Sequence, residues 1–91
     1  MIQVHFSSLF VPYVGERDLA VNVDVGTLGD LFELLIERFP EWRDEVTQDG
    51  HTPDYNLLIA VNGELASSMS GLATRLQPDD RVEFHLLLTG G

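Results

Sequence analysis

The sequence predicts a small two-layer α+β domain, in which one amphipathic helix packs on one face of a sheet. Apolar and polar residues alternate near both ends of the chain, and this alternation is typical of half-buried strands. Residues 28–39 instead place apolar side chains three and four positions apart, which is typical of a helix. The chain has 91 residues, so we expect a single hydrophobic core.

The first two strands are expected at residues 2–7 and 19–25, where apolar side chains occupy every second position. The segment between them contains Pro12 and Gly15, two residue types that favour turns. We therefore expect the two strands to form a hairpin whose connection is a turn.

The helix is expected to begin after Thr27 and to end before Pro40. Thr27 and Asp30 match a capping box, in which each side chain accepts a backbone hydrogen bond from the other residue. The residue before a proline disfavours helical dihedral angles, so Pro40 ends the helix. The expected buried stripe is Leu28, Leu31, Phe32, Leu35, Ile36 and Phe39, and the acidic residues Asp30, Glu33 and Glu37 are expected to form a solvated face.

Residues 41–55 are polar and contain the turn signals Asp49-Gly50 and Thr52-Pro53. We expect a short exit from the helix followed by a long loop, with Trp42 packing this loop against the core.

Three more strands are expected in the second half of the chain. Residues 56–62 form a nearly continuous apolar run, which predicts a central strand covered on both faces. Asn62-Gly63 predicts a tight hairpin turn into a short strand at 64–66. In the connection 67–77, Leu72 and Leu76 are expected to fill the core. After a turn at 78–80, the last strand, 81–88, is expected to bury Val82, Phe84, Leu86 and Leu88.

This order of elements predicts a β-grasp, or ubiquitin-like, fold. With a right-handed crossover, the first and last strands lie parallel in the middle of a mixed sheet of four to five strands packed on one main helix. The expected organisation is a domain over residues 1–88 and a C-terminal tail over residues 89–91.

The charge of the chain argues against nucleic-acid and membrane binding. The formal net charge is −10, and all five basic residues are arginine, so the surface repels phosphate backbones and anionic lipid. No cysteine is present for a disulfide or a thiolate metal site. No leader-like or membrane-spanning segment is evident, so we expect a cytoplasmic protein whose charged partners are basic.

The residues also argue against an enzyme. We find no phosphate-binding loop, nucleophile triad or pair of catalytic carboxylates, and we expect no bound cofactor. His5 and His85 are expected to point outward from neighbouring strands, but a two-histidine metal site would lack further ligands. His51 is expected in a solvated loop with Asp49 and Asp54. We therefore expect no metal.

Two candidate functional features remain. The first is the tail, Thr89 with Gly90 and Gly91, because residues without a Cβ permit a narrow chain to enter an enzyme tunnel; a frayed terminus or a cloning remnant is the alternative. The second is the outward face of the last strand, with Arg81, His85 and Leu87. These residues form a candidate docking surface, although single exposed leucines are ordinary.

The chain resembles the prokaryotic ubiquitin-like sulfur carrier family, which includes MoaD-like, ThiS-like and CysO-like proteins. The resemblance extends over essentially the whole chain. It lies in residues 2–6, 26–31, 61–64 and 79–82 and in the terminal Gly90-Gly91. The long loop at 43–55 and residues 71–74 are more similar to the CysO-like branch, and residues 85–89 differ from the proline-containing run before Gly-Gly in many members.

The resemblance implies that Gly91 is the working residue. A ThiF/MoeB-like adenylating enzyme would use ATP to activate the Gly91 carboxylate, a sulfur donor would convert it to a thiocarboxylate, and a biosynthetic enzyme would accept the sulfur. Thr89 and Gly90 would thread the tail into these partners. The chain would then be a carrier and not an enzyme, monomeric when free, and a cysteine or related pathway is favoured over molybdopterin or thiamine. One alternative is a ubiquitin-like modifier joined through Gly91 to lysines of target proteins. Another is a β-grasp interaction module with an idle tail.

Overall fold

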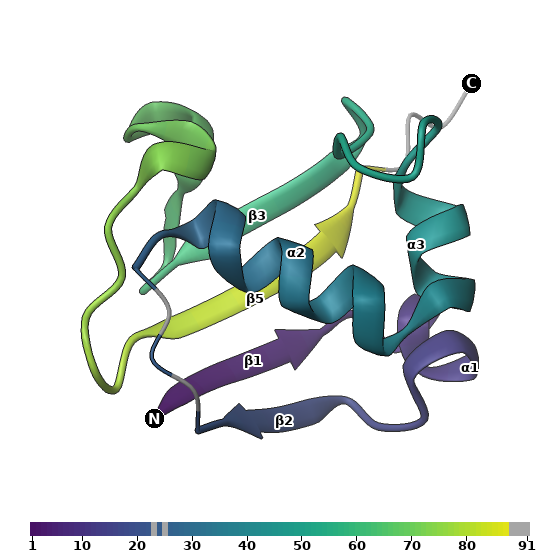
Figure 1. Ribbon diagram of the computed structural model, residues 1–91, viewed down its shortest axis with the longest axis horizontal. Helices are drawn as coiled ribbons and strands as arrows, with labels where there is room; N and C mark the ends of the chain where they lie inside the picture. The colour runs from purple at the N-terminus through teal and green to yellow at the C-terminus, as the bar shows by residue number, and fades with distance from the viewer. Residues whose placement is uncertain (23, 25, 88–91) are drawn as a thin grey trace.

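The computed structural model describes residues 1–22, 24 and 26–87, and within them five strands form one mixed sheet (Figure 1). In space the order is β2-β1-β5-β3-β4. β1 and β5 are parallel neighbours and the other pairs are antiparallel, which confirms the predicted β-grasp arrangement. The strands are β1 (Ile2–Phe6), β2 (Asp18–Val21), β3 (Leu57–Val61), β4 (Glu64–Leu65) and β5 (Arg81–Leu86).

The main helix, α2 (Leu28–Arg38), lies across one face of the sheet (Figure 1). Its capping box is present as predicted. The Asp30 amide donates to the Thr27 hydroxyl at 3.2 Å, and the Thr27 amide donates to the Asp30 carboxylate at 3.1 Å. Five residues of the predicted stripe are buried, and Phe39 packs against the core as a partly buried residue. The sequence was therefore sufficient to place this helix.

A second helix, α3 (Pro40–Val46), occupies the start of the segment expected to be a loop, so that prediction is wrong over these residues. Pro40 ends α2 as expected, but it also starts α3. Proline suits the first turn of a helix, where its missing N–H would have no partner in any case. Trp42 and Val46, one turn apart, are both fully buried.

The connection between β1 and β2 also contains helical turns that were not predicted. A 3-10 turn, η1 (Ser8–Phe10), leads into the short helix α1 (Val11–Val14). Phe10 and Val14 are buried and attach this connection to the core. Gly15 then ends α1 with φ 86°, a left-handed conformation that glycine adopts without strain.

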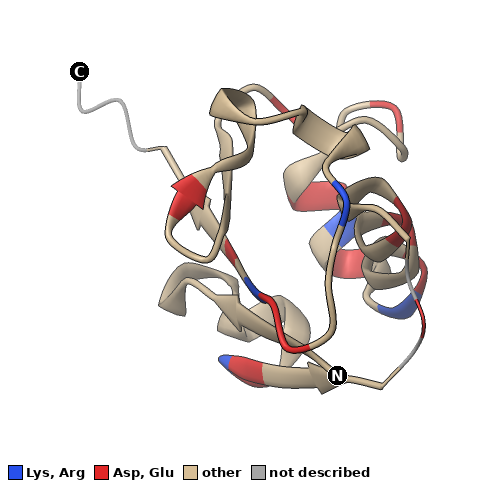
Figure 2. Cartoon of the chain, turned by 90° about the vertical axis from the view of Figure 1, so that its left-hand side faces the viewer, with Lys and Arg blue, Asp and Glu red and all other residues tan. Residues whose placement is uncertain are grey.

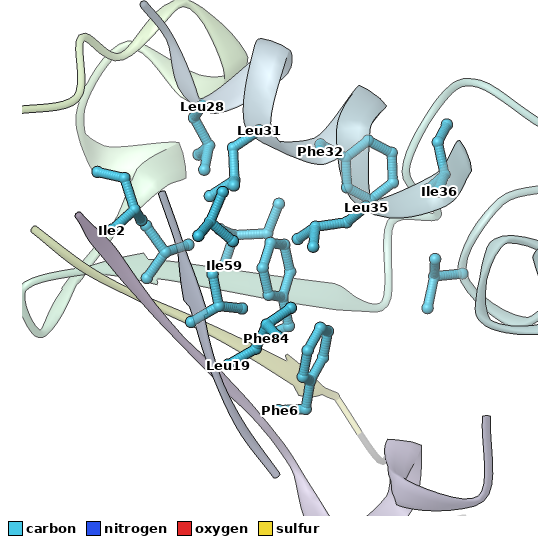
Figure 3. Packing of buried hydrophobic residues seen from close by; sticks show 14 of the residues in the cluster. Ile2, Phe6, Leu19, Leu28, Leu31, Phe32, Leu35, Ile36, Ile59 and Phe84 are labelled. Atoms are coloured by element: carbon cyan, nitrogen blue, oxygen red, sulfur yellow. The ribbon is translucent and has the colours of Figure 1, made fainter. Parts of the chain in front are cut away.

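Apolar side chains from α2 and from the inner face of the sheet form the core (Figure 3). Trp42 lies among the core aromatic rings and is completely inaccessible, so the prediction that it packs against the core is confirmed. Its ring centroid is 5.2 Å from those of both Phe6 and Phe84, with edge-to-face geometry. α3 is thereby attached to the sheet and to α2.

The region around β3 requires three corrections. β5, not β3, is the central strand, and the outer face of β3 is incompletely covered because Leu58 is only half-buried. β4 ends at Leu65, since Ala66 already begins the 3-10 turn η2 (Ala66–Ser68). Leu72, in the next turn η3 (Gly71–Ala73), is 39% exposed and does not fill the core, whereas Leu76 is buried as expected.

The predicted turn at Asn62-Gly63 is confirmed, because both residues have positive φ angles, 52° and 86°. β2 ends at Val21 and β5 at Leu86. The predictions for Val23, Val25 and Leu88 fall outside the described residues. Across the described ranges, no helix combines the length and the apolar character needed to cross a membrane.

Candidate functional site: the outer sheet face and the C-terminal exit

The end of β5 carries the chain from the middle of the sheet towards the terminal glycines. Leu86 pairs with Leu57 and packs against the core as a partly buried side chain. The Leu87 amide then donates to the Asn56 carbonyl at 2.7 Å, so the pairing with the β3 side continues past the end of β5. Leu87 is therefore held against the start of β3. Thr89, Gly90 and Gly91, the tail predicted to be functional, lie outside the described residues.

The predicted docking residues lie along β5 at alternating positions. Val82 and Phe84 are completely buried on the helix side, so Arg81, Glu83 and His85 project from the opposite, outer face. Arg81 is exposed and donates to Glu83 at 3.4 Å, and His85 is half-buried.

Leu87 continues this alternation beyond the strand and is 44% exposed. The structure thus places Arg81, His85 and Leu87 in one row, with Leu87 nearest the tail.

Two apolar residues that sequence reasoning missed lie next to this row. Leu58 pairs directly with His85 across β3 and β5. Leu65 pairs with Ala60 on the same outer face and is 44% exposed. We call Leu58, Leu65, His85 and Leu87 the outer patch. The Asn62-Gly63 turn sets the register of β3 against β4, but no local sequence signal reports the register of β3 against β5, on which the grouping also depends.

The two outward histidines are close neighbours, as predicted, but His5 has a carboxylate partner that was not foreseen. The ring centroids of His5 and His85 are 6.1 Å apart, and His5 Nδ1 lies 2.8 Å from Asp18 Oδ1. The hydrogen bond from His5 lowers the pKa of Asp18, against a smaller opposing effect of desolvation. Among the described residues, no group of three or more His, Asp and Glu side chains is arranged to hold a metal ion.

The loop after α3 is ordered by one carboxylate. Asp49 accepts hydrogen bonds from the main-chain amides of Thr52 and His51, at 2.7 and 2.8 Å, and from the Thr52 hydroxyl at 2.8 Å. These bonds, that of the Thr52 amide foremost, lower the pKa of Asp49 to about 2. His51 itself is exposed and lies 3.8 Å from Glu33, as expected for a solvated loop.

Negative charge is distributed over much of the surface. Figure 2 shows Asp and Glu on the helices and on the turn before β5, with few basic residues among them. At −10, this charge would attract basic partner surfaces.

Comparison with known proteins gives one match to a family model. The model of the ThiS family matches residues 9–91. No curated protein sequence matches significantly.

Solved structures match over almost the whole chain. SAMP1 from Haloferax volcanii is 22% identical with a TM-score of 0.84, covering 99% of this chain and 98% of its own. A chain of the Amycolatopsis orientalis BexX/CysO complex is 15% identical with a TM-score of 0.81, and both chains are covered completely. Urm1 from Trypanosoma brucei is 27% identical with a TM-score of 0.77, covering 99% of this chain and 94% of its own. These likenesses establish the fold.

Proposed function

This chain belongs to the ThiS family of ubiquitin-like sulfur carriers and modifiers, and from this premise we propose that Gly91 carries sulfur as a C-terminal thiocarboxylate. One observation supports the proposal above the others. The family match extends over residues 9–91 and so includes the terminal Gly90-Gly91. The same match includes β5 and Leu87, whose amide is held by the Asn56 carbonyl.

The proposed chemistry needs a partner enzyme because a carboxylate is a poor electrophile. An adenylating enzyme would join the Gly91 carboxylate to AMP from ATP, with release of pyrophosphate. A hydrosulfide equivalent would then attack the acyl carbon, so that a C–S bond forms, the C–O bond to AMP breaks and AMP leaves. Thr89 and Gly90 would thread through the enzyme's tunnel, where the missing Cβ atoms of the glycines avoid steric clashes. This chain would supply the acyl group and a docking surface, and its partners would supply the catalysis.

We place the docking surface on the outer patch together with Arg81. Leu87 and Leu58 offer apolar contact area beside the tail, and His85 lies between them on the same face. The net charge of −10 favours basic surfaces on the adenylating enzyme and on the sulfur-accepting enzyme, so both associations should weaken with added salt. A free monomer leaves this surface accessible. The resemblance of residues 43–55 and 71–74 to the CysO-like branch favours cysteine or a related sulfur metabolite as the product.

The decisive experiment is intact-mass spectrometry after co-expression with the adenylating enzyme of the source organism. We expect a mass gain equal to the exchange of one oxygen for one sulfur, confined to the C-terminal peptide. Deleting Gly91 should abolish this gain, whereas the matched variant Leu9→Ala, at an exposed leucine of η1, should retain it. An unchanged mass in the presence of an enzyme that adenylates the chain would contradict the proposal.

A second candidate function is protein modification through Gly91, which the structural likeness to a small archaeal modifier protein favours. Trypsin cleaves after Arg81, and no later Lys or Arg follows, so a conjugated target lysine would carry the segment Val82–Gly91 after digestion. Because the chain contains no lysine, it could not extend such conjugates through its own side chains. Finding this remnant on other proteins would support the modifier, and finding only the thiocarboxylate would support the carrier.

A further inference from the structure

β3 has an open edge. β4 pairs only with Ala60 and Val61, so the preceding residues, Leu57–Ile59, pair with β5 on one side and with no strand of the described chain on the other. In Figure 1 this edge lies between the turns that follow β4 and the loop that follows α3. An unpaired strand edge presents backbone donors and acceptors to which another extended chain can bind.

The pairing pattern shows which backbone groups point to this edge. The Leu87 amide bonds to the Asn56 carbonyl and the Asn62 amide bonds to the Arg81 carbonyl, so the even-numbered residues of β3 direct their backbone groups to β5. Leu57 and Ile59 therefore direct theirs to the open edge.

The Leu57 amide is already engaged, because it donates to the Asp54 carbonyl at 3.0 Å. The Leu57 carbonyl and the Ile59 amide also point outward, on either side of Leu58. In a parallel pairing, one residue of the added strand would donate its amide to the Leu57 carbonyl and accept a hydrogen bond from the Ile59 amide with its own carbonyl.

An apolar groove of about 230 Å³ follows this edge. It lies between β3, the start of α2 and the turns η2 and η3. Three of its side chains are unusually exposed for their type: Tyr55 at 88%, Leu65 at 44% and Leu72 at 39%. Single exposed apolar residues are ordinary, but a group that borders one groove at an open strand edge is typical of a binding surface. The apolar lining includes Leu28, Tyr55, Leu57, Ile59, Leu65 and Leu72.

The charge near the groove indicates the kind of partner. Residues 47–74, which supply most of the lining, contain Asp49, Asp54 and Glu64 but no Lys or Arg. The next basic residue in the sequence is Arg75. A second copy of this chain would bring another net charge of −10, so electrostatics opposes self-association at this edge.

We propose that this edge groove binds an extended apolar segment of a different protein, with Lys or Arg flanking the segment, by adding a strand to β3. Among the described residues, the lining of the groove contains none of Arg81, His85 and Leu87. The groove shares Leu58 and Leu65 with the outer patch, so a partner bound there would contact the edge of that patch and leave Arg81, His85 and Leu87 accessible.

A labelled synthetic peptide tests this proposal directly. It would alternate isoleucine and threonine, with lysines at both ends, and its binding would be followed by fluorescence anisotropy and by amide chemical shifts of the protein. We expect shifts at Leu57–Ile59 and in residues 65–72, with slower hydrogen exchange at the Ile59 amide. Leu72→Glu should weaken binding at least about tenfold, because it places a carboxylate in the apolar groove. The control Leu9→Glu adds the same charge at a similarly exposed leucine outside the groove and should leave binding unchanged.

Two control peptides separate strand addition from simple charge attraction. In the first, a central proline removes a backbone donor and should prevent binding. In the second, glutamates replace the terminal lysines, and their repulsion by the acidic chain should prevent binding as well. Equal binding of either control peptide, or an unchanged affinity of Leu72→Glu, would overturn the proposal. Self-association of the free chain that Leu72→Glu abolishes would also overturn it, since the groove would then serve a second copy. Deleting Gly91 should leave peptide binding intact, so this result is independent of thiocarboxylate formation.

Discussion

The amide of Leu87 donates to the carbonyl of Asn56 at 2.7 Å, which attaches the last described residue before the tail to the start of β3. The buried Oδ1 atom of the Asn56 side chain has no hydrogen-bond partner among residues 1–22, 24 and 26–87. The position of Leu87 is thus set by a contact between residues distant in sequence. The Leu87 side chain itself is exposed, and a partner that takes up Gly90 and Gly91 must approach close to it.

Leu87 is the residue at which docking and stability can be separated most cleanly. Replacing it with glutamate should lower affinity for the adenylating enzyme about tenfold, because an apolar contact is lost and a negative charge is added to an acidic surface. Its side chain is 44% exposed, so the unfolding temperature should barely change. Calorimetric titration with the enzyme measures the affinity, and Leu9→Glu is the control of equal charge and similar exposure. Equal affinity of the two variants would remove Leu87 from the docking surface.

Asp49 should make stability depend on pH in a narrow acidic range. Its pKa is about 2 in the folded chain and 3.8 in the reference state, so its ionised form stabilises the fold above the reference value. This stabilisation is lost as the pH falls from about 4 towards 2. Thermal unfolding of Asp49→Asn should show reduced stability at neutral pH, and the deficit should shrink across this range.

Glu16→Gln provides the control for the Asp49 experiment. Glu16 is exposed, and its replacement removes one negative charge without disturbing the hydrogen-bonded loop. A deficit for Asp49→Asn that stays constant down to pH 2 would show that the charge of Asp49 contributes nothing.

The capping box should contribute measurably to the stability of α2. Thr27→Ala removes the acceptor for the Asp30 amide and should lower the free energy of unfolding by about 1 kcal/mol. Thr27→Ser keeps the hydroxyl and should recover most of this loss. Urea unfolding followed by circular dichroism measures both variants, and equal losses would show that the threonine acts through its methyl group instead.

Trp42 should be the most sensitive single position in the core. Trp42→Ala leaves a cavity among Phe6, Phe10, Phe32 and Phe84 and should cost about 3–5 kcal/mol. That is a large part of the roughly 5–15 kcal/mol by which a domain is usually stable. Trp42→Phe keeps an aromatic ring and should lose less. Circular dichroism is the suitable readout, because Trp42 is the only tryptophan. A loss below that of Thr27→Ala would contradict this assignment.

Local patterns predicted much of this fold correctly. The alternation in β1 and β5, the Thr27-Asp30 cap and the Asn62-Gly63 turn each depend on a few neighbouring residues, and all are present. The loop expected after α2 failed for a different reason. Pro40 was interpreted only as a helix terminator, although it also fits the first turn of a helix, and the spacing of Trp42 and Val46 was consistent with one.

The candidate site was less predictable than the fold. Alternation along β5 was enough to place Arg81, His85 and Leu87 on one face. It could not show that Leu58 lies opposite His85, that Asp18 bonds to His5, or that Asn56 holds Leu87. Each of these contacts joins different strands, and many registers satisfy the same alternation.

By itself, the sequence determined the order of the five strands and the main helix α2, the buried faces of β1, α2 and β5, the acidic surface without lysine and the glycine pair at its end. These properties are local or compositional, so they do not depend on how the strands pair. Tertiary structure alone decided the neighbours of the outer row, the point from which the tail starts, and the open edge that follows from the shortness of β4. Strand register and edge exposure arise from pairing between distant segments, which is set by packing of the whole core.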